Sequence, residues 1–292
     1  MFTCSLCPRA CHALRDDISG QGFCRLPDVM RIGRIAPHLW EEPPISGTRG
    51  TGAVFFSGCT LQCLYCQNGA ISHRGEGRIF TPEALADAMH RLVDMGMQTI
   101  SFITATPYTY AILEALELYR PPVPLVWNTS GYESVETLRL LDGVIDVYLP
   151  DLKHYSSRMS SLCAGAPDYF PVATQAILEM VRQHPSPVYD ADSIMQKGVL
   201  IRHLILPGCT TESLRLLDWI HEHLPSETPV SLMQQYVPFG DLPQGLNRRI
   251  TRREYHRVRD YMLTLGIPGF YQGPTAADAA FVPSFNQPDS FV

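Results

Sequence analysis

The chain alternates between short, nearly continuous apolar runs and longer segments in which apolar residues recur with the period of a helix. The runs are rich in β-branched and aromatic residues, which favours strands buried on both faces, as in a parallel sheet. They lie at 52–58, 99–106, 124–131, 144–153, 198–208 and 229–236. This alternation predicts a parallel α/β architecture, either an open barrel or a doubly wound sheet. In both, ligands bind at the carboxyl ends of the strands.

Helix ends are marked in the sequence. Thr81 is placed to cap a helix that Gly96 ends, because a threonine hydroxyl accepts from the first turn and glycine tolerates the left-handed conformation. Thr251 and Glu254 have the spacing of a capping box. We expect helices at both places.

The ends of the chain differ from its middle. Residues 1–50 show poor periodicity and many turn formers, which predicts a small irregular module rich in cysteine. The regular pattern fills 51–272 and predicts the core domain. Residues 273–292 carry no clear element and are expected to form a tail.

Composition excludes some classes of protein and favours another. The net charge of −6 and the scattered basic residues argue against binding to nucleic acid or an anionic membrane. No apolar run approaches the ~18 residues that span a bilayer. The first residues lack a secretory signal, so we expect a cytoplasmic protein, in which nine cysteines indicate metal binding rather than disulfides.

Three of those cysteines follow the first predicted strand. Cys59, Cys63 and Cys66 have the spacing C-x3-C-x-aromatic-C, with Tyr65 as the aromatic residue. Structural zinc usually takes four protein ligands, so three thiolates in one tight loop fit it poorly. They do fit an iron–sulfur cluster that leaves one iron open to another ligand.

This loop resembles the signature of the radical S-adenosylmethionine (SAM) enzymes. The resemblance implies that the three cysteines bind a [4Fe-4S] cluster whose fourth iron is chelated by the amino and carboxylate groups of SAM. It also implies reductive cleavage of SAM to methionine and a 5′-deoxyadenosyl radical that abstracts hydrogen. Tyr65 is expected to pack on the adenine side.

The resemblance extends over about residues 51–240. The stretches "SGCTLQCLYCQN", "NTSGYES", "YLPDLKHYS" and "RHLILPG" are similar to the pyruvate formate-lyase-activating-enzyme-like branch, in particular to members with an N-terminal cysteine module. That implies an open (β/α)6 partial TIM barrel. Asp151 and Lys153 match an Asp-x-Lys pair that contacts SAM and shapes the active site, so they are our catalytic candidates. Without the motif, they would be interpreted as a surface ion pair.

The chain also departs from that branch. The Gly-Gly-Glu motif that binds the SAM amino group is missing, so the backbone carbonyls of Thr104 and Thr106 are expected to replace it. Asn128 stands where the branch tends to have aspartate, which weakens the expectation of a monovalent-cation site, and Tyr236 replaces a histidine. The predicted SAM pocket comprises Tyr65, Thr104, Thr106, Asn128, Ser130, Asp151, Lys153 and Arg202. His203 is either part of that pocket or a core residue.

Four further cysteines lie near the amino terminus. Cys4, Cys7, Cys11 and Cys24 can close a metal site completely, as an auxiliary [4Fe-4S] cluster or as a structural zinc. The remaining two, Cys163 and Cys209, are expected to be small hydrophobic residues rather than ligands.

Three hypotheses on function follow. The first is an activase that takes a glycyl radical enzyme as its protein partner. The second is a small-molecule enzyme, such as an epimerase, a dehydrogenase or a lyase, and thus an oxidoreductase or a lyase by class. The third is a non-catalytic iron–sulfur carrier. Either enzyme would need a reductant of the flavodoxin or ferredoxin type.

Overall fold

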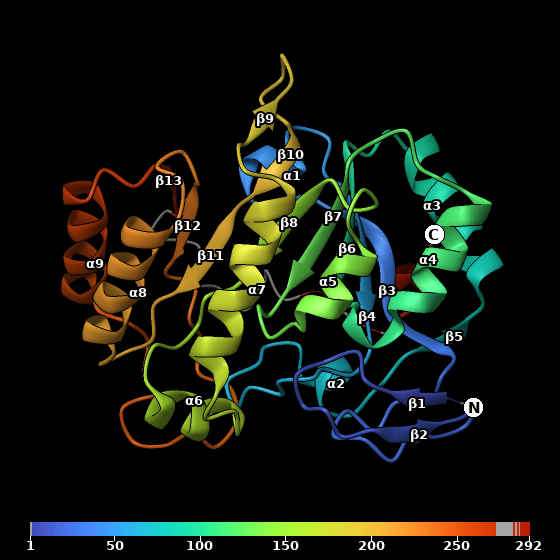
Figure 1. The fold of residues 1–292 in the computed structure, drawn as a ribbon, viewed down its shortest axis with the longest axis horizontal. Coiled ribbons are helices and arrows are strands. Elements are labelled where there is room, and N and C mark those ends of the chain that lie inside the picture. Colours follow the sequence, from blue (N-terminus) through green and yellow to red (C-terminus); the bar gives the residue numbers. More distant parts are fainter. Residues whose placement is uncertain (1, 273–282, 284, 286) are drawn as a thin grey trace.

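The protein has an α/β fold built on a large twisted sheet (Figure 1). The computed structural model describes residues 2–272, 283, 285 and 287–292. Among these, the strands form sheets of eight, three and two. The order in the largest is β5 (Arg78–Phe80), β3 (Met30–His38), β4 (Thr51–Phe56), β6 (Thr99–Ile103), β7 (Leu125–Thr129), β8 (Val147–Pro150), β10 (Met195–Val199) and β9 (Val188–Tyr189). Strands β4, β6, β7, β8 and β10 are parallel, and their carboxyl ends meet at one edge.

The predicted strand at 198–208 is divided in two. β10 ends at Val199, and β11 (Ile201–Leu204) begins a smaller parallel sheet with β12 (Val230–Met233) and β13 (Gly269–Tyr271). The Leu152 amide donates to the carbonyl of Arg202 at 2.8 Å, and Asp151 pairs with Arg202 in an isolated parallel bridge. The smaller sheet therefore starts beside the carboxyl end of β8.

Helices alternate with the strands and lie outside the sheet (Figure 1). The longer ones are α3 (Pro82–Asp94), α4 (Thr109–Leu118), α5 (Val135–Leu140), α6 (Ser157–Ala164), α7 (Tyr169–Gln183), α8 (Thr210–His223) and α9 (Arg252–Thr264). The predicted caps are confirmed: the Thr81 hydroxyl accepts from the Ala84 amide, and Thr251 with Glu254 forms a capping box. None of the helices among the described residues has the length and apolarity to cross a bilayer.

Residues 30–38 differ from the expectation of an irregular N-terminal segment. They form β3, a nine-residue strand that pairs antiparallel with β4 and with β5. Gly33 and Pro37 make this stretch resemble a turn in sequence. Proline is nevertheless tolerated there, because β5 pairs only with Met30–Ile32 and leaves the end of β3 with β4 as its neighbour.

The segment before β3 packs against the cysteine loop. It contains the small antiparallel pair β1 (Phe2–Cys4) and β2 (Ala13–Arg15), which lies near α2 (Gly69–Ser72) in Figure 1. The Arg9 guanidinium donates to the carbonyls of Thr60 at 2.9 Å, Ala164 at 2.9 Å and Gly165 at 2.6 Å. These three bonds hold the segment against the loop and the end of α6.

The chain after β3 closes the opposite end of the sheet. The short helix α1 (Pro43–Ser46) lies at the other end of the strands from α2 (Figure 1). Ile45 is fully buried in a cluster with Val126, Val147, Leu149, Met195 and Leu200. The Thr99 hydroxyl at the start of β6 donates to the Ile45 carbonyl at 3.0 Å. This helix therefore covers the amino ends of the strands from inside.

The end of the chain returns to the sheet. Of the predicted tail, residues 273–282, 284 and 286 lie outside the described part of the structure. Pro288–Ser290 form a short 3-10 helix, η3, and the Val292 amide donates to the Ile35 carbonyl at 3.0 Å. Phe291 stacks on Phe80, with ring centroids 5.8 Å apart. These contacts fix the last residues along β3.

Candidate active site

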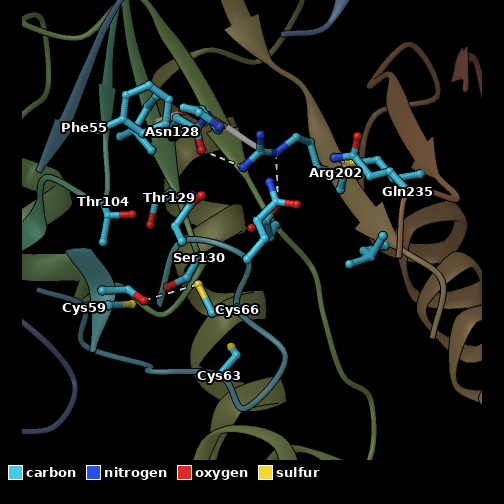
Figure 2. A pocket seen from close by; sticks show the side chains of 18 of the residues that line it. Phe55, Cys59, Cys63, Cys66, Thr104, Asn128, Thr129, Ser130, Arg202 and Gln235 are labelled. Atoms are coloured by element: carbon cyan, nitrogen blue, oxygen red, sulfur yellow. Dashed lines mark hydrogen bonds and ion pairs between the residues drawn. The ribbon is translucent and has the colours of Figure 1, made fainter. Parts of the chain in front are cut away.

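A cavity of about 450 Å³ opens at the carboxyl ends of the parallel strands. Its size suits a small-molecule site. Its walls come from the loop after β4, from the ends of β6, β7 and β8, from β11 and β12, and from residues 38–42. In Figure 2, the cysteines of the loop lie at one end of the cavity, while Asn128 and Arg202 lie at the other.

Cys59, Cys63 and Cys66 all line this cavity. Burial raises the pKa of the Cys63 thiol, and the nearby ammonium of Lys153 lowers it in part. Two sulfurs accept hydrogen bonds. Cys59 accepts from the Leu61 amide at 3.3 Å, and Cys66 accepts from the Ser72 hydroxyl at 3.3 Å, the bond drawn as a dashed line at Cys66 in Figure 2. The sequence-predicted cysteines are thus brought together on one wall.

A network of charged side chains crosses the cavity. Asp151 accepts from Lys153 Nζ at 2.5 Å and from Arg202 Nε at 2.9 Å, and Arg202 Nη2 also donates to Asn128 Oδ1 at 2.6 Å. Burial favours the neutral form of Asp151, but the charges of Arg202 and Lys153 outweigh it and hold its pKa below the usual value. The Arg202 guanidinium therefore places a fixed positive charge between Asn128 and Asp151.

Backbone geometry turns two strand ends into the cavity. Thr104, directly after β6, has φ +61°, a conformation rare for a β-branched residue. Gly131 has φ +77°, and a Cβ there would overlap the carbonyl oxygen of Asp151. The glycine lets the chain after β7 approach the end of β8 closely. Both Thr104 and Ser130, which the sequence analysis assigned to the SAM pocket, line the cavity.

Two acidic residues of the site were missed in the sequence. Glu41 and Glu42 belong to the stretch "LWEEPP", which the sequence analysis assigned to the irregular N-terminal module, yet both line the cavity. Glu41 Oε1 accepts from Asn128 Nδ2 at 3.0 Å, and Arg202 Nη1 lies 3.4 Å from Glu41 Oε2. Burial raises the pKa of Glu42 to about 7. Adjacent acids beside a tryptophan and two prolines were the available signal.

The four N-terminal cysteines also come together. Cys4, Cys7, Cys11 and Cys24 line a second, very small cavity with Arg9 and Thr60, next to the cysteine loop. Among the described residues, no group of three or more His, Cys, Asp or Glu side chains is arranged to hold a metal ion. That finding covers the three loop cysteines as well as the quartet: in both places the thiols line a common cavity, without the spacing of a bound metal.

Comparison with known families decides the assignment. The model of the radical SAM superfamily matches residues 53–220, more than half of the chain, and the match includes the three cysteines and the Asp151–Lys153 pair. This chain belongs to the radical SAM superfamily. Membership implies a [4Fe-4S] cluster and SAM as cofactors.

Individual relatives are more distant. Uncharacterized protein MJ0674 of Methanocaldococcus jannaschii is 28% identical over 269 residues, which cover 87% of this chain and 72% of that protein. A Haemophilus influenzae protein, provisionally named a glycyl-radical enzyme activating enzyme, is 23% identical over 70% of this chain and 80% of its own length.

Solved structures show the same fold. A radical SAM methyltransferase from Sphaerobacter thermophilus has a TM-score of 0.55 at 15% identity, covering 80% of this chain and 70% of that one. Methylornithine synthase has a TM-score of 0.50 at 14% identity, covering 76% and 70%. At these identities, the likeness extends to the TIM-barrel-like fold and no further.

The residues present fit the cofactors of a radical SAM protein. Three thiols on one wall match a cluster that keeps one iron open towards the cavity. Beside them, Lys153 remains charged, because the attraction of Asp151 outweighs the effect of burial and raises the lysine pKa. A buried ammonium is a suitable partner for the carboxylate of an amino acid.

Thr106 is not where the sequence placed it. It lies one turn beyond the cavity, in the 3-10 helix η1 (Thr106–Tyr108), and does not line the wall. Its hydroxyl donates to Glu133 Oε1 at 2.6 Å, and Thr129 donates to the same oxygen. The chain turns away from the cavity directly after Thr104. Thr104 therefore lines the cavity, and Thr106 does not.

Tyr65 and Tyr236 form one aromatic wall of the cavity. Their rings meet edge to face, with centroids 5.9 Å apart. The Tyr65 hydroxyl is 3.2 Å from His154 Nε2, and the Tyr236 hydroxyl donates to the Leu246 carbonyl at 2.7 Å. Both hydroxyls are engaged with protein groups, so these residues contribute aromatic rings rather than free hydroxyls to the wall.

The remaining sequence candidates belong to the core. His203 is buried, and its ring nitrogens lie 2.7 Å from the Leu152 carbonyl and 2.8 Å from the Ser213 hydroxyl. Cys163 is fully buried in the main hydrophobic cluster, and Cys209 packs against it. Neither cysteine lines the cavity.

Proposed function

We propose that this radical SAM protein is an enzyme that cleaves SAM at a cluster held by Cys59, Cys63 and Cys66 and abstracts hydrogen from a substrate in the cavity. One observation carries the proposal. The three thiols and the Asp151–Lys153 pair, which are far apart in the sequence, line a single cavity. A cluster with an open iron and a charge partner for an amino acid carboxylate would then face the same ligand.

Each wall residue has a proposed role. Lys153 Nζ pairs with the SAM carboxylate, and Asp151 holds that ammonium in place at 2.5 Å. The carbonyls near Thr104 and Ser130 accept from the SAM amino group, since the backbone turns into the cavity there. Tyr65 and Tyr236 cover the adenine with their rings, and Arg202 with Asn128 closes the far side.

Apolar residues near the end of the chain help to shield the cavity from water. When bound, the cluster would supply the electron that cleaves the sulfonium of SAM. Pro283 lines the cavity, and Phe285 packs edge to face on Phe55 with centroids 5.6 Å apart. These apolar residues narrow the cavity and help to exclude water, which protects a carbon radical from side reactions.

The architecture completes the proposal. We infer that the parallel strands of the two larger sheets together form an open (β/α)6 barrel, supported by the Asp151–Arg202 bridge between the sheets. The N-terminal quartet would hold an auxiliary [4Fe-4S] cluster or a zinc ion beside the cysteine loop. A flavodoxin or ferredoxin would supply the electrons.

A glycyl-radical-enzyme activase is the second candidate. It is favoured by the name of the Haemophilus influenzae relative and by the Asp151–Lys153 motif. An enzyme acting on a small molecule is favoured by the charged residues at the end of the cavity away from the cysteines. The two candidates differ in substrate and share the cleavage of SAM.

The test is anaerobic reconstitution of the wild type and of a Cys59→Ala/Cys63→Ala/Cys66→Ala variant, with counts of iron and zinc. 5′-Deoxyadenosine is measured after reduction with dithionite. We expect the variant to lose about four irons and all 5′-deoxyadenosine. Cys209→Ala is the matched control and should lose neither. A wild type that binds the full cluster but makes no 5′-deoxyadenosine would support the non-catalytic carrier instead.

A further inference from the structure

One carboxylate of the cavity has a free oxygen. Glu42 is only 8% exposed, it lines the cavity, and its Oε2 atom has no hydrogen-bond partner among the described residues. A buried polar atom without a hydrogen-bond partner is costly, and each one in a folded protein calls for an explanation. Its neighbour Glu41, by contrast, is bonded to Asn128 and paired with Arg202.

Carboxyl groups outnumber lysine and arginine side chains among the residues that line the cavity. Glu41, Glu42 and Asp151 contribute three carboxylates, and Lys153 and Arg202 contribute two cations. Asp151 lies between both cations, and Arg202 also reaches Glu41. Arg202 acts on Glu42 only from beyond ion-pair distance, so Glu42 is the carboxyl group that no cation of the described cavity wall contacts directly. A ligand with a positive charge would complete the set.

Glu42 lies at the end of the cavity away from the proposed SAM site. Glu42 directly precedes α1, which covers the amino ends of the strands, whereas the cysteines follow the carboxyl end of β4. Its neighbour Glu41 contacts Asn128 and Arg202, and Figure 2 shows that these two residues lie at the end of the cavity away from the cysteines. The amino group of SAM, which would lie at the cluster, belongs to the opposite end.

We propose that this end of the cavity binds the ammonium or guanidinium group of a small-molecule substrate, with Glu42 as its charge partner. The proposal rests on the proposed function, since it names the substrate class of the same site. Gln235 and Gln272, joined by a 3.0 Å hydrogen bond, line the cavity as well and offer amide groups to the polar part of such a molecule. The cation would occupy one end and the reacting carbon would face the other.

Binding to the reconstituted enzyme with SAM present tests this inference. The cationic probes are putrescine and agmatine, and the uncharged counterpart is 1,4-butanediol, all measured by titration calorimetry. We expect at least one cationic probe to bind and its uncharged counterpart not to bind. Glu42→Gln should weaken that binding about tenfold to a hundredfold, because it removes one charge-assisted hydrogen bond and keeps the side-chain shape.

Two further variants control for the charge of the side chain and for its position. Glu42→Asp retains the charge on a shorter side chain and should bind the probe with intermediate affinity. Glu117→Gln, on the exposed face of α4, removes the same charge far from the cavity and should bind like the wild type. Circular dichroism of each variant establishes that it is folded.

The outcomes separate this inference from the proposed function. 5′-Deoxyadenosine is measured on the same samples. A wild type that cleaves SAM but binds none of the cationic probes, or binds neutral ones equally well, overturns the inference alone. Unchanged probe binding by Glu42→Gln overturns it too. A wild type that makes no 5′-deoxyadenosine overturns the proposed function, whatever the calorimetry shows.

Discussion

Arg202 Nε lies 2.9 Å from Asp151 Oδ1, and this ion pair joins the end of β8 to the first strand of the smaller sheet. Both side chains are largely buried, with 15% and 13% of their surface exposed. Because Arg202 also contacts Asn128 and Glu41, one guanidinium links three carboxylate or amide groups from separate parts of the chain. Arg202 therefore holds together three of the segments that form the cavity wall.

Replacing that arginine should destabilise the protein. In Arg202→Ala, Glu41 loses its cation and Asp151 keeps only Lys153, so buried charge is left uncompensated. We expect unfolding to become easier by about 3–5 kcal/mol, measured by chemical denaturation of the apoprotein. Arg74→Ala breaks an ion pair with Glu76 in which both side chains are exposed, and serves as the control, with a much smaller effect. Equal losses in the two variants would contradict a special role for the network.

The hydrogen bond from Ser72 to Cys66 should tune the redox potential of a cluster bound at the loop. A donor to sulfur stabilises the more negatively charged, reduced state. In Ser72→Ala, the potential should therefore fall by roughly 20–60 mV, the equivalent of one hydrogen bond for a one-electron couple. Potentiometric titration followed by electron paramagnetic resonance measures this. Ser161→Ala, at an exposed position, should leave the potential unchanged.

Removing one cysteine of the N-terminal quartet should remove one metal centre and leave the other. In Cys7→Ala, we expect loss of about four irons if the quartet holds a cluster, or of one zinc if it holds that ion. Elemental analysis after anaerobic reconstitution distinguishes the two. The loop cluster should remain visible by its response to SAM. If the metal content does not change, the quartet is not a metal site.

Glu133 should make stability depend on pH. Burial raises its pKa to about 7 in the folded protein, against 4.5 for an ordinary glutamate. The folded state thus binds the proton more tightly, and this contribution to stability is fully present below pH 4.5 and is lost as the pH rises through 7.

The variant Glu133→Gln tests this directly. It should be more stable than the wild type by about 3 kcal/mol above pH 8, since a pKa difference converts at about 1.4 kcal/mol per unit. Below pH 4.5 the difference should vanish. Denaturation of the apoprotein across this pH range provides the measurement, with Glu117→Gln as the exposed control. A stability difference between the variant and the wild type that does not change with pH would contradict the raised pKa of Glu133.

Sequence patterns predicted local features well because each depends on neighbouring residues. Each of the six apolar runs contains a strand, and the caps at Thr81 and Thr251 form as expected. The three cysteines were recognisable because their spacing lies within one loop. Strand β3 was missed, since the hydrophobic pattern around Gly33 and Pro37 is interrupted and only pairing with β4 and β5 makes it a strand.

By itself, the sequence determined the alternation of six main strands with helices, the superfamily, and the cysteines and charged pair that mark it. These depend on periodicity and on motifs of a few residues. Only the tertiary structure decided that Glu41 and Glu42 enter the cavity and that Thr106 does not. The physical reason is that both placements depend on contacts between distant parts of the chain, which leave no periodic signal in the residues themselves. Ile45 of α1 packs against side chains of β7, β8 and β10, whereas Thr106 of η1 bonds to Glu133.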